Sequence, residues 1–172
     1  MRHLTKTVLL LGALTLAACS GNPFNRGNGP VGANAGAGYG AGNPAGTVSP
    51  NSVEFFQQNV GDRVLFAVDQ STLSPEARTT LAGQSQWLMQ NIEYAVVIEG
   101  HADEQGTREY NLALGARRAA SVRDFLVSQG INANRVRTVS YGKERPIEIC
   151  STEACYSKNR RAVTVVTAGA SS

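Results

Sequence analysis

Three residues that could do chemistry together lie in one short polar loop of this sequence. The loop runs over residues 100–107 and contains His101, Asp103 and Glu104. It follows an apolar segment, and the carboxyl end of a strand is where α/β-type folds commonly place ligands. Its carboxylates and imidazole could form a hydrolytic or metal site, or they could pair with a basic residue.

Arg118 is the basic residue that the helical pattern brings toward this loop. At about 100° per residue, the segment 108–129 has one apolar face, and Asn111, Leu114 and Arg118 form a row on it. An arginine on an inward face must meet an anion, because an unpaired buried charge costs several kcal/mol. Two interpretations stay open: a salt bridge with Asp103 that only holds the loop, or a pocket in which both charges bind a ligand.

Helix caps and apolar periodicity predict the elements that position these residues. Ser74-Pro75 is a typical helix start, and Gly130 is a typical helix stop. Helices are therefore predicted at about 74–90 and 108–129, and strands within 64–69, 94–99, 136–141 and 162–167. We expect an α+β sandwich with the helices packed on one face of a four-stranded sheet.

The N-terminal residues predict export and a lipid anchor. Residues 1–18 carry Arg2 and Lys6, and their apolar stretch is shorter than the ~20 residues of a bilayer-spanning helix. They are followed by Cys19, and Leu16-Ala17-Ala18-Cys19 resembles the lipobox of bacterial lipoproteins. We expect cleavage before Cys19 and lipid on its sulfur. The alternative is a secretory signal that ends near a buried or free cysteine.

The residues after Cys19 predict a flexible tether over 19–51. Between Gly21 and Pro50 the sequence has nine Gly, four Pro and five Asn, so it cannot bury enough surface to fold. The globular domain is expected over residues 52–172. Ser20, rather than Asp, follows the cysteine, which in the sorting pattern of enteric bacteria favours the outer membrane.

Charge and cysteine usage narrow the function classes. Without the signal, fourteen basic and thirteen acidic residues remain, which gives no electrostatic case for nucleic acid. Cys150 and Cys155 remain as a pair in an exported domain, where a local disulfide is the default. The mature chain keeps one histidine, His101, and no serine has a nucleophile elbow around it. We therefore expect no metal site, no cofactor and no catalysis.

Several separated motifs resemble the OmpA-like peptidoglycan-binding domain family. They are Glu99-Gly100-His101-Ala102-Asp103-Glu104, Asn111-x-x-Leu114-Gly115-x-x-Arg118-Ala119, Ser140-Tyr141-Gly142-Lys143-Glu144 and Tyr156-Ser157-Lys158-Asn159-Arg160-Arg161-Ala162-Val163. The resemblance covers residues 62–167. The lipobox, the Gly-rich tether and the single domain narrow it to the lipoproteins of this family. It implies a βαβαββ sandwich with a mixed sheet.

The resemblance also implies a ligand, the meso-diaminopimelate of uncrosslinked stem peptides. Asp103 would bind its ammonium group and Arg118 its carboxylate, and a zwitterionic head does require one anion and one cation close together. We expect single substitutions of either residue to weaken binding by roughly ten- to a hundredfold and to affect folding less, in an open pocket that water reaches. The remaining expected pocket residues are Val68, Asp69, Leu114 and Asn111.

Arg160 and Arg161 directly precede the predicted strand 162–167. Side chains alternate in direction along a strand, so one of these arginines would face the pocket and the other the solvent. We expect Arg161 in a supporting role there. Two positions depart from the family pattern: Val68 stands where these lipoproteins usually have Phe, and Gln105 where they usually have Arg.

A bridge between Cys150 and Cys155 would close a small ring and add about 2 kcal/mol to the stability of the domain. We expect loss of this disulfide to loosen the loop that contains it but to leave ligand binding intact.

The resemblance further implies a place and partners for the protein. It would lie on the periplasmic face of the outer membrane and bind TolB, within the Tol system that ties this membrane to the wall during division. The rival interpretation is a lipoprotein with the same wall-binding domain but a different protein partner, such as an assembly-complex subunit or a general envelope anchor.

Overall fold

The computed structural model describes residues 48–168, so the expected signal peptide, Cys19 and most of the expected tether lie outside the described part. Four strands form one sheet in the order β1-β4-β2-β3. They are β1 (Arg63–Leu65), β2 (Tyr94–His101), β3 (Val136–Gly142) and β4 (Arg161–Ala168). β4 is antiparallel to β1 and β2, whereas β2 and β3 are parallel, so the sheet is mixed.

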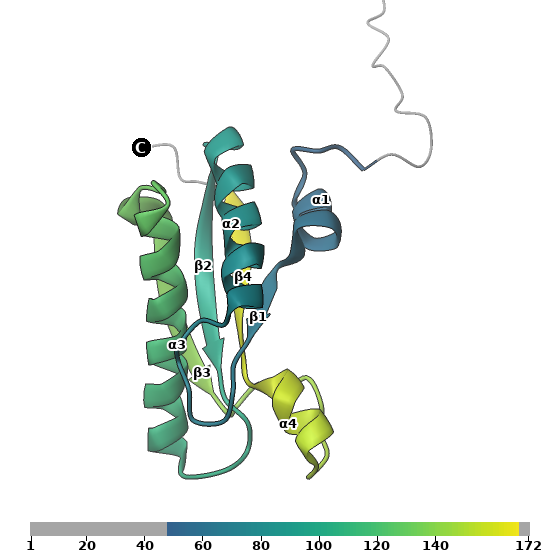
Figure 1. The fold of residues 1–172 in the computed structure, drawn as a ribbon, viewed down its shortest axis with the longest axis vertical. Coiled ribbons are helices and arrows are strands. Elements are labelled where there is room, and N and C mark those ends of the chain that lie inside the picture. The colour runs from purple at the N-terminus through teal and green to yellow at the C-terminus, as the bar shows by residue number, and fades with distance from the viewer. Residues whose placement is uncertain (1–47, 169–172) are drawn as a thin grey trace, which may run out of the picture. The chain divides into compact units, whose positions relative to one another are not determined.

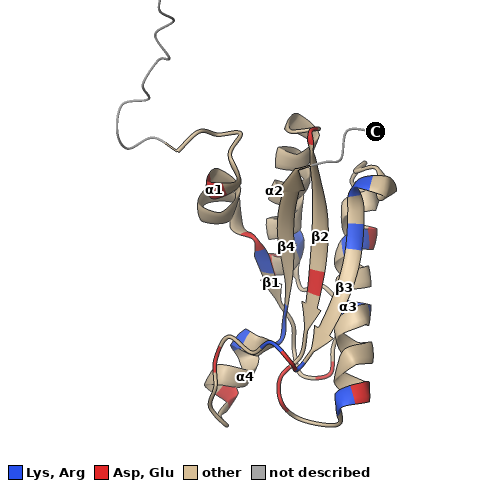
Figure 2. Ribbon diagram, turned by 180° about the vertical axis from the view of Figure 1, so that it is seen from behind, with Lys and Arg blue, Asp and Glu red and all other residues tan. Residues whose placement is uncertain are grey.

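Helices α2 (Pro75–Gln90) and α3 (Arg108–Ser128) both pack on one face of this sheet (Figure 1). The opposite face is turned toward the viewer in Figure 2. The expectation of an α+β sandwich with helices on one face is confirmed. The predicted Ser74 cap is present, because Ser74 Oγ accepts a hydrogen bond from Ala77 N at 3.1 Å. Thr107, which the sequence analysis did not name, caps α3, since its Oγ1 accepts a hydrogen bond from Tyr110 N at 3.2 Å.

The core lies between the sheet and these two helices. Its fully buried apolar side chains come mainly from these two layers, and the largest of them are Phe56, Leu81, Leu88, Ile98, Leu126, Val96 and Val122. Burial of such side chains is worth about 1.5–3 kcal/mol each, which makes this layer the main source of stability. None of the described helices has the length and apolar character of a membrane-spanning segment.

The structure contains three short helical segments that the sequence did not predict. They are α1 (Val53–Phe55) with the π-helical turn η1 (Phe56–Gly61), the 3-10 turn η2 (Ala133–Arg135), and α4 (Glu153–Asn159). Elements of this length are too short to show an apolar period. The first of them matters for packing, because the Phe56 ring lies 4.9 Å from that of Trp87.

Strand β1 is shorter than the apolar run 64–69 suggested. It ends at Leu65, and Phe66 N donates its hydrogen bond to Arg160 O at 2.9 Å, outside the sheet ladder. Ala67–Gln70 form a turn in which Asp69 has a φ of 54°. Left-handed backbone is uncommon for any residue other than glycine, although Asp tolerates it better than most. This turn directs backbone carbonyls toward α3.

Candidate functional site

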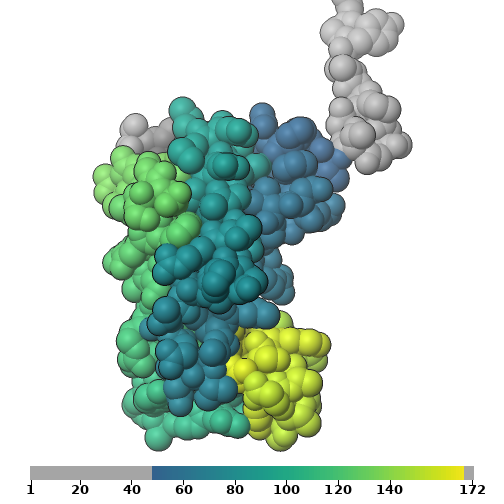
Figure 3. Space-filling view, viewed as in Figure 1, coloured from purple at the N-terminus to yellow at the C-terminus, as the bar shows by residue number. Residues whose placement is uncertain are grey.

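Three segments that are distant in the sequence meet at one end of the sheet. They are the loop after β1, the loop between β2 and α3, and the segment that contains α4. Figure 3 shows the α4 segment, in yellow, beside the loop after β1. The expected pocket residues are therefore brought to one region of the molecule by the order of the strands.

Arg118 is the centre of this region and is completely buried. Its guanidinium donates hydrogen bonds to three backbone carbonyls: Nε to Gln70 O at 2.8 Å, Nη1 to His101 O at 2.8 Å, and Nη2 to Ala67 O at 3.1 Å. Arg118 thus ties the loop after β1 to the end of β2. The guanidinium has five N–H groups, so one on each terminal nitrogen is left after these contacts.

The charge of Arg118 is held in a low-dielectric setting. Burial lowers its pKa to about 10, and the nearby Asp103 carboxylate opposes this shift. The guanidinium also lies 5.1 Å from the centre of the Phe66 ring. Arg118 stays positively charged at neutral pH, and its two remaining N–H groups are available to an anion.

Asp103 is also buried, with 7% of its surface exposed, but its ion pair is with Arg160. Arg160 Nη1 donates to Asp103 Oδ2 at 3.1 Å, and Asp103 Oδ1 accepts from Gln105 N at 3.3 Å. A direct salt bridge between Asp103 and Arg118 was one of the two open interpretations, and the structure instead pairs each with other groups. Asp103 acts on Arg118 through space, as a charge nearby.

Arg160 is the site residue that the sequence analysis missed, and the prediction that one arginine of the pair meets solvent is wrong. Arg160 and Arg161 are each only 5% exposed. Arg160 reaches Asp103, whereas Arg161 donates to Arg145 O at 3.1 Å and to Asn159 O at 3.3 Å. The strict alternation assumed for a strand fails because Arg160 precedes β4 and is the C-cap of α4.

The remaining expected pocket residues lie around this centre. Asn111 is buried and donates to Gln105 O at 2.7 Å, so it holds the Asp103 loop against α3. Leu114 is buried on the same helix face. Val68 is half exposed at the rim, and exposed Asp69 accepts a hydrogen bond from Tyr110 Oη at 3.2 Å. The arrangement is a closed, charged centre with an exposed rim.

A close approach between β2 and α3 sets the position of Arg118. A Cβ added to Gly100 would lie 1.9 Å from Gly115 O, and one added to Gly115 would lie 2.4 Å from Ser140 Oγ. Only glycines allow the strand and the helix to come this near. One helical turn beyond Gly115, Arg118 can then reach the carbonyl of His101.

The His101 side chain points away from Arg118, into a buried cluster of its own. Burial and then the charges of Arg161 and Arg145 lower its pKa to about 4. Neither ring nitrogen has a hydrogen-bond partner among the described residues, and Glu99 Oε2 lies 3.6 Å from Nε2. The ring packs against Tyr141 with centroids 5.5 Å apart. At neutral pH His101 is a neutral packing residue.

Two surface hollows of about 450 and 440 Å³ lie apart from this centre. The first is between η1 and α2, and the second is between the loop after β1, α2 and α3. The centre itself is closed, contrary to the expectation of an open pocket that water reaches. Within residues 48–168, no three His, Cys, Asp or Glu side chains are grouped so that they could hold a metal ion.

The sequence of this chain is similar to known proteins over the residues that form this fold. The model of the OmpA family matches residues 65–160. The peptidoglycan-associated lipoprotein of Mesorhizobium japonicum is 57% identical over 129 residues, which cover 75% of this chain and 77% of that protein. The peptidoglycan-associated lipoprotein of Rhizobium meliloti is 50% identical over 159 residues, 92% of this chain and 85% of that protein.

Solved structures give the same fold. The crystal structure of the peptidoglycan-associated lipoprotein from Burkholderia pseudomallei matches with a TM-score of 0.64 at 32% identity, over 69% of this chain and 100% of that one. The C-terminal domain of Helicobacter pylori MotB matches with a TM-score of 0.59 at 20% identity, over 63% of this chain and 86% of that one. The second likeness concerns the fold alone.

Proposed function

This chain belongs to the OmpA family, and on that premise we propose that it is an outer-membrane lipoprotein that binds peptidoglycan without changing it chemically. The similarity to peptidoglycan-associated lipoproteins extends over most of the chain. One observation carries the proposal: Arg118 and Asp103, buried charges of opposite sign, lie close together at the end of the sheet. Charges held this way are suited to a zwitterionic ligand.

The ligand we propose is the free amino-acid end of meso-diaminopimelate in an uncrosslinked stem peptide. Its carboxylate would accept from the remaining N–H groups of Arg118, and its ammonium would bind Asp103. Val68 and Asp69 form the exposed rim through which the ligand enters. Ala67 O and Gln70 O belong to the loop after β1 and accept hydrogen bonds from Arg118. A movement of this loop away from the guanidinium would therefore open the centre to the ligand.

At the level of the cell, we propose that the protein anchors the outer membrane to the wall within the Tol-Pal system, with TolB as its protein partner. In this role it supports envelope integrity and constriction of the outer membrane during division. The rival is a wall-binding lipoprotein with another protein partner. A pull-down from solubilised envelopes, with and without TolB, separates the two, because only the first predicts a complex that depends on TolB.

The proposed binding is tested by co-sedimentation of the purified full chain, in detergent, with sacculi that contain diaminopimelate. The Arg118→Lys variant is compared with Arg117→Lys, a neighbouring exposed position on the same helix. We expect binding of wild type and of Arg117→Lys, and a loss of at least about tenfold for Arg118→Lys because an ammonium cannot replace the planar fork.

Sacculi whose third stem residue is lysine are the ligand control, and the supernatant is analysed for released fragments. Equal sedimentation with both kinds of sacculi would refute the diaminopimelate assignment. Absence of wild-type sedimentation would refute wall binding, and steady release of muropeptides would show an enzyme instead.

A further inference from the structure

We propose that the segment Cys150–Tyr156, whose first six residues form a ring closed by a disulfide, positions the ligand-binding loop, so that capture of the ligand depends on the redox state of the two cysteines. The inference rests on the proposed function and adds a means of regulation to the same site. The residues of this segment act through Glu104 and Arg160, and they are positioning residues.

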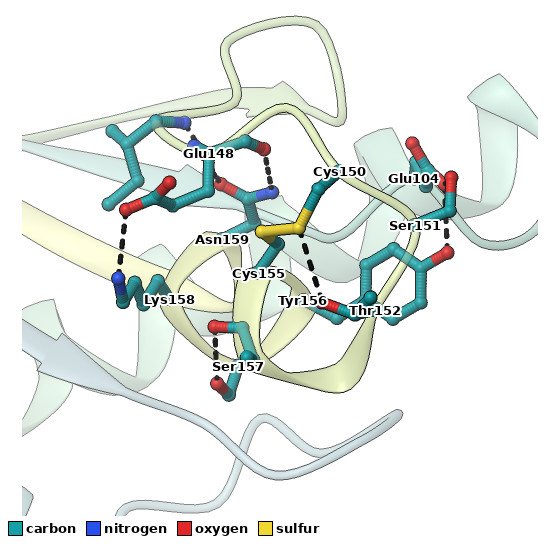
Figure 4. Close-up of a disulfide and its surroundings, with 12 residues drawn as sticks. Glu104, Glu148, Cys150, Ser151, Thr152, Cys155, Tyr156, Ser157, Lys158 and Asn159 are labelled. Atoms are coloured by element: carbon teal, nitrogen blue, oxygen red, sulfur yellow. Dashed lines mark hydrogen bonds and ion pairs between the residues drawn. A yellow bond between two sulfur atoms is a disulfide. The ribbon is translucent and has the colours of Figure 1, made fainter.

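The disulfide joins Cys150 to Cys155, with the two Cα atoms 5.9 Å apart, and it closes the turn that leads into α4. Figure 4 shows the Ser151 and Tyr156 side chains on the same side of the disulfide, both next to Glu104. Cys150 is exposed, whereas Cys155 is buried on the first turn of the helix. A reductant can therefore reach the bond from the solvent side.

The first connection from this segment to the site runs through Glu104. Glu104 Oε1 accepts hydrogen bonds from Tyr156 Oη at 2.8 Å and from Ser151 Oγ at 2.9 Å. These two donors lower the pKa of Glu104, with Tyr156 as the larger cause. Because Glu104 directly follows Asp103 in the chain, its two donors restrict the backbone that carries the ligand-binding carboxylate.

The second connection runs through Arg160. Both terminal nitrogens of Arg160 donate to the carboxylate of Glu153, which begins α4, and Nη1 also donates to Asp103 Oδ2 at 3.1 Å. The hydrogen bond to Glu153 is the larger cause of a raised pKa for Arg160. Glu153 thus orients the guanidinium that faces Asp103, and Glu153 stands inside the ring that the disulfide closes.

The base of the segment is held independently of the disulfide. Asn159 Oδ1 accepts from Ile147 N at 2.9 Å and from Glu148 N at 3.2 Å, and its Nδ2 donates to Glu148 O at 2.8 Å. Lys158 Nζ pairs with Glu148 at 2.8 Å. Opening of the disulfide would therefore release the tip, with Ser151 and Glu153, while the domain stays folded. The sequence alone suggested a local role for the bridge, but these contacts extend it to the site.

The expected consequence is a loss of preorganisation. Reduction by a dithiol adds two electrons and two protons to the S–S bond, which yields two thiols while the dithiol becomes a disulfide. If the loop then holds its binding arrangement about one-fifth of the time, the apparent dissociation constant rises about fivefold. The change falls on the association rate, because the contacts made after capture are the same.

The test measures association and dissociation of the full chain in detergent on an immobilised stem tripeptide that ends in meso-diaminopimelate. Oxidised wild type, confirmed by non-reducing peptide mapping, is compared with the same protein after dithiothreitol. The double variant Cys150→Ser with Cys155→Ser is measured in both conditions. We expect reduced wild type and the double variant to associate about fivefold more slowly than oxidised wild type, with unchanged dissociation rates. The reductant should not change the association rate of the double variant.

A second variant leaves the disulfide intact. Tyr156→Phe removes one donor to Glu104, and we expect association to slow about threefold with little change in melting temperature. Its matched control is Lys158→Gln in the same helix, which breaks only the contact with Glu148. We expect this control to behave as wild type.

The outcomes separate the inference from the proposed function. If oxidised wild type binds the tripeptide and reduction leaves its association rate unchanged, the redox inference is overturned and wall binding stands. If Tyr156→Phe associates like wild type, the route through Glu104 is overturned. If oxidised wild type fails to bind both the tripeptide and sacculi, the proposed function itself fails.

Discussion

Asp103 and Arg160, 57 residues apart in the sequence, form a buried ion pair in which Arg160 Nη1 lies 3.1 Å from Asp103 Oδ2. The acid that the sequence placed opposite Arg118 thus has a different direct partner. Two arginines and two aspartates, Asp103 and Asp69, act in this region, and Arg160 is further compensated by Glu153. Of the two arginines, Arg118 has no direct ion pair among the described residues, which suits it to hold a carboxylate.

We predict that Asp103→Asn weakens binding to sacculi by about tenfold or more, because the amide cannot attract an ammonium group. The cost in stability should be about 1–3 kcal/mol, since Arg160 keeps Glu153 as a partner. Asp124→Asn, at an exposed acid of α3 whose one ion pair among the described residues is with Arg123, is the control for a lost negative charge. Co-sedimentation with urea unfolding measures both effects. Wild-type binding by folded Asp103→Asn would contradict the assignment.

For Arg118 we predict a loss of stability as well as of binding. The three carbonyls are bound by three different guanidinium nitrogens, and the single nitrogen of Arg118→Lys cannot reproduce this arrangement. Each carbonyl left without a donor in this buried site costs about 1–3 kcal/mol. This differs from the sequence-based expectation that folding changes less than binding. Thermal denaturation of Arg118→Lys and of the exposed control Arg117→Lys checks it, and equal melting temperatures would argue against the three carbonyl contacts.

Gly100→Ala should destabilise the domain by about 3 kcal/mol or more, because its Cβ would lie 1.9 Å from the backbone oxygen of Gly115. Gly83→Ala is the matched control in α2, where the nearest atom to an added Cβ is 3.8 Å away. There we expect a gain of about 0.5–1 kcal/mol from helix propensity. The midpoints of urea unfolding compare the two, and a tolerated Gly100→Ala would show that β2 and α3 are less tightly packed.

His101 predicts a pH dependence of stability. Its pKa is about 4 in the folded protein and near 6.5 in the unfolded chain. The unfolded state therefore binds more protons in between, so His101 stabilises the fold fully above pH 6.5 and loses this contribution as the pH falls to 4. Across this window the titration of His101 lowers the free energy of unfolding by about 3 kcal/mol at most.

His101→Phe keeps a ring beside Tyr141 and removes the titration. Arg161, Arg145 and Glu99 face the same group and remain in the variant. We expect a flatter stability profile between pH 6.5 and 4 than for wild type, measured by urea unfolding at each pH. Parallel profiles for the two proteins would assign the pH dependence to other groups.

Cys19→Ala should yield either unprocessed precursor or soluble periplasmic protein, because the sulfur that would carry lipid is absent. Cys150 and Cys155 serve as internal controls, since their replacement should leave membrane attachment unchanged. Detergent-phase partitioning and the mass of the mature N-terminus measure the result. Mature Cys19→Ala protein in the detergent phase would contradict lipidation at this residue.

The principal elements of the fold could be predicted from the sequence because they depend on local rules. The Ser74 cap, the Gly130 stop and the apolar periods of 74–90 and 108–129 each act within a few residues, and α2 and α3 follow them closely. The inward position of Arg118 was likewise predictable, since a helical projection needs no tertiary information.

The partners of the charged residues were decided only by the tertiary structure. Antiparallel pairing of β4 with β1 and β2 brings Arg160 to Asp103, and the turn at Asp69 supplies Arg118 with carbonyl oxygens. No local pattern encodes such contacts, because they depend on strand order and on backbone groups that every residue carries. The sequence by itself determined that Arg118 would be buried, whereas the topology of the sheet buried Arg160 as well and decided what each of these charges meets.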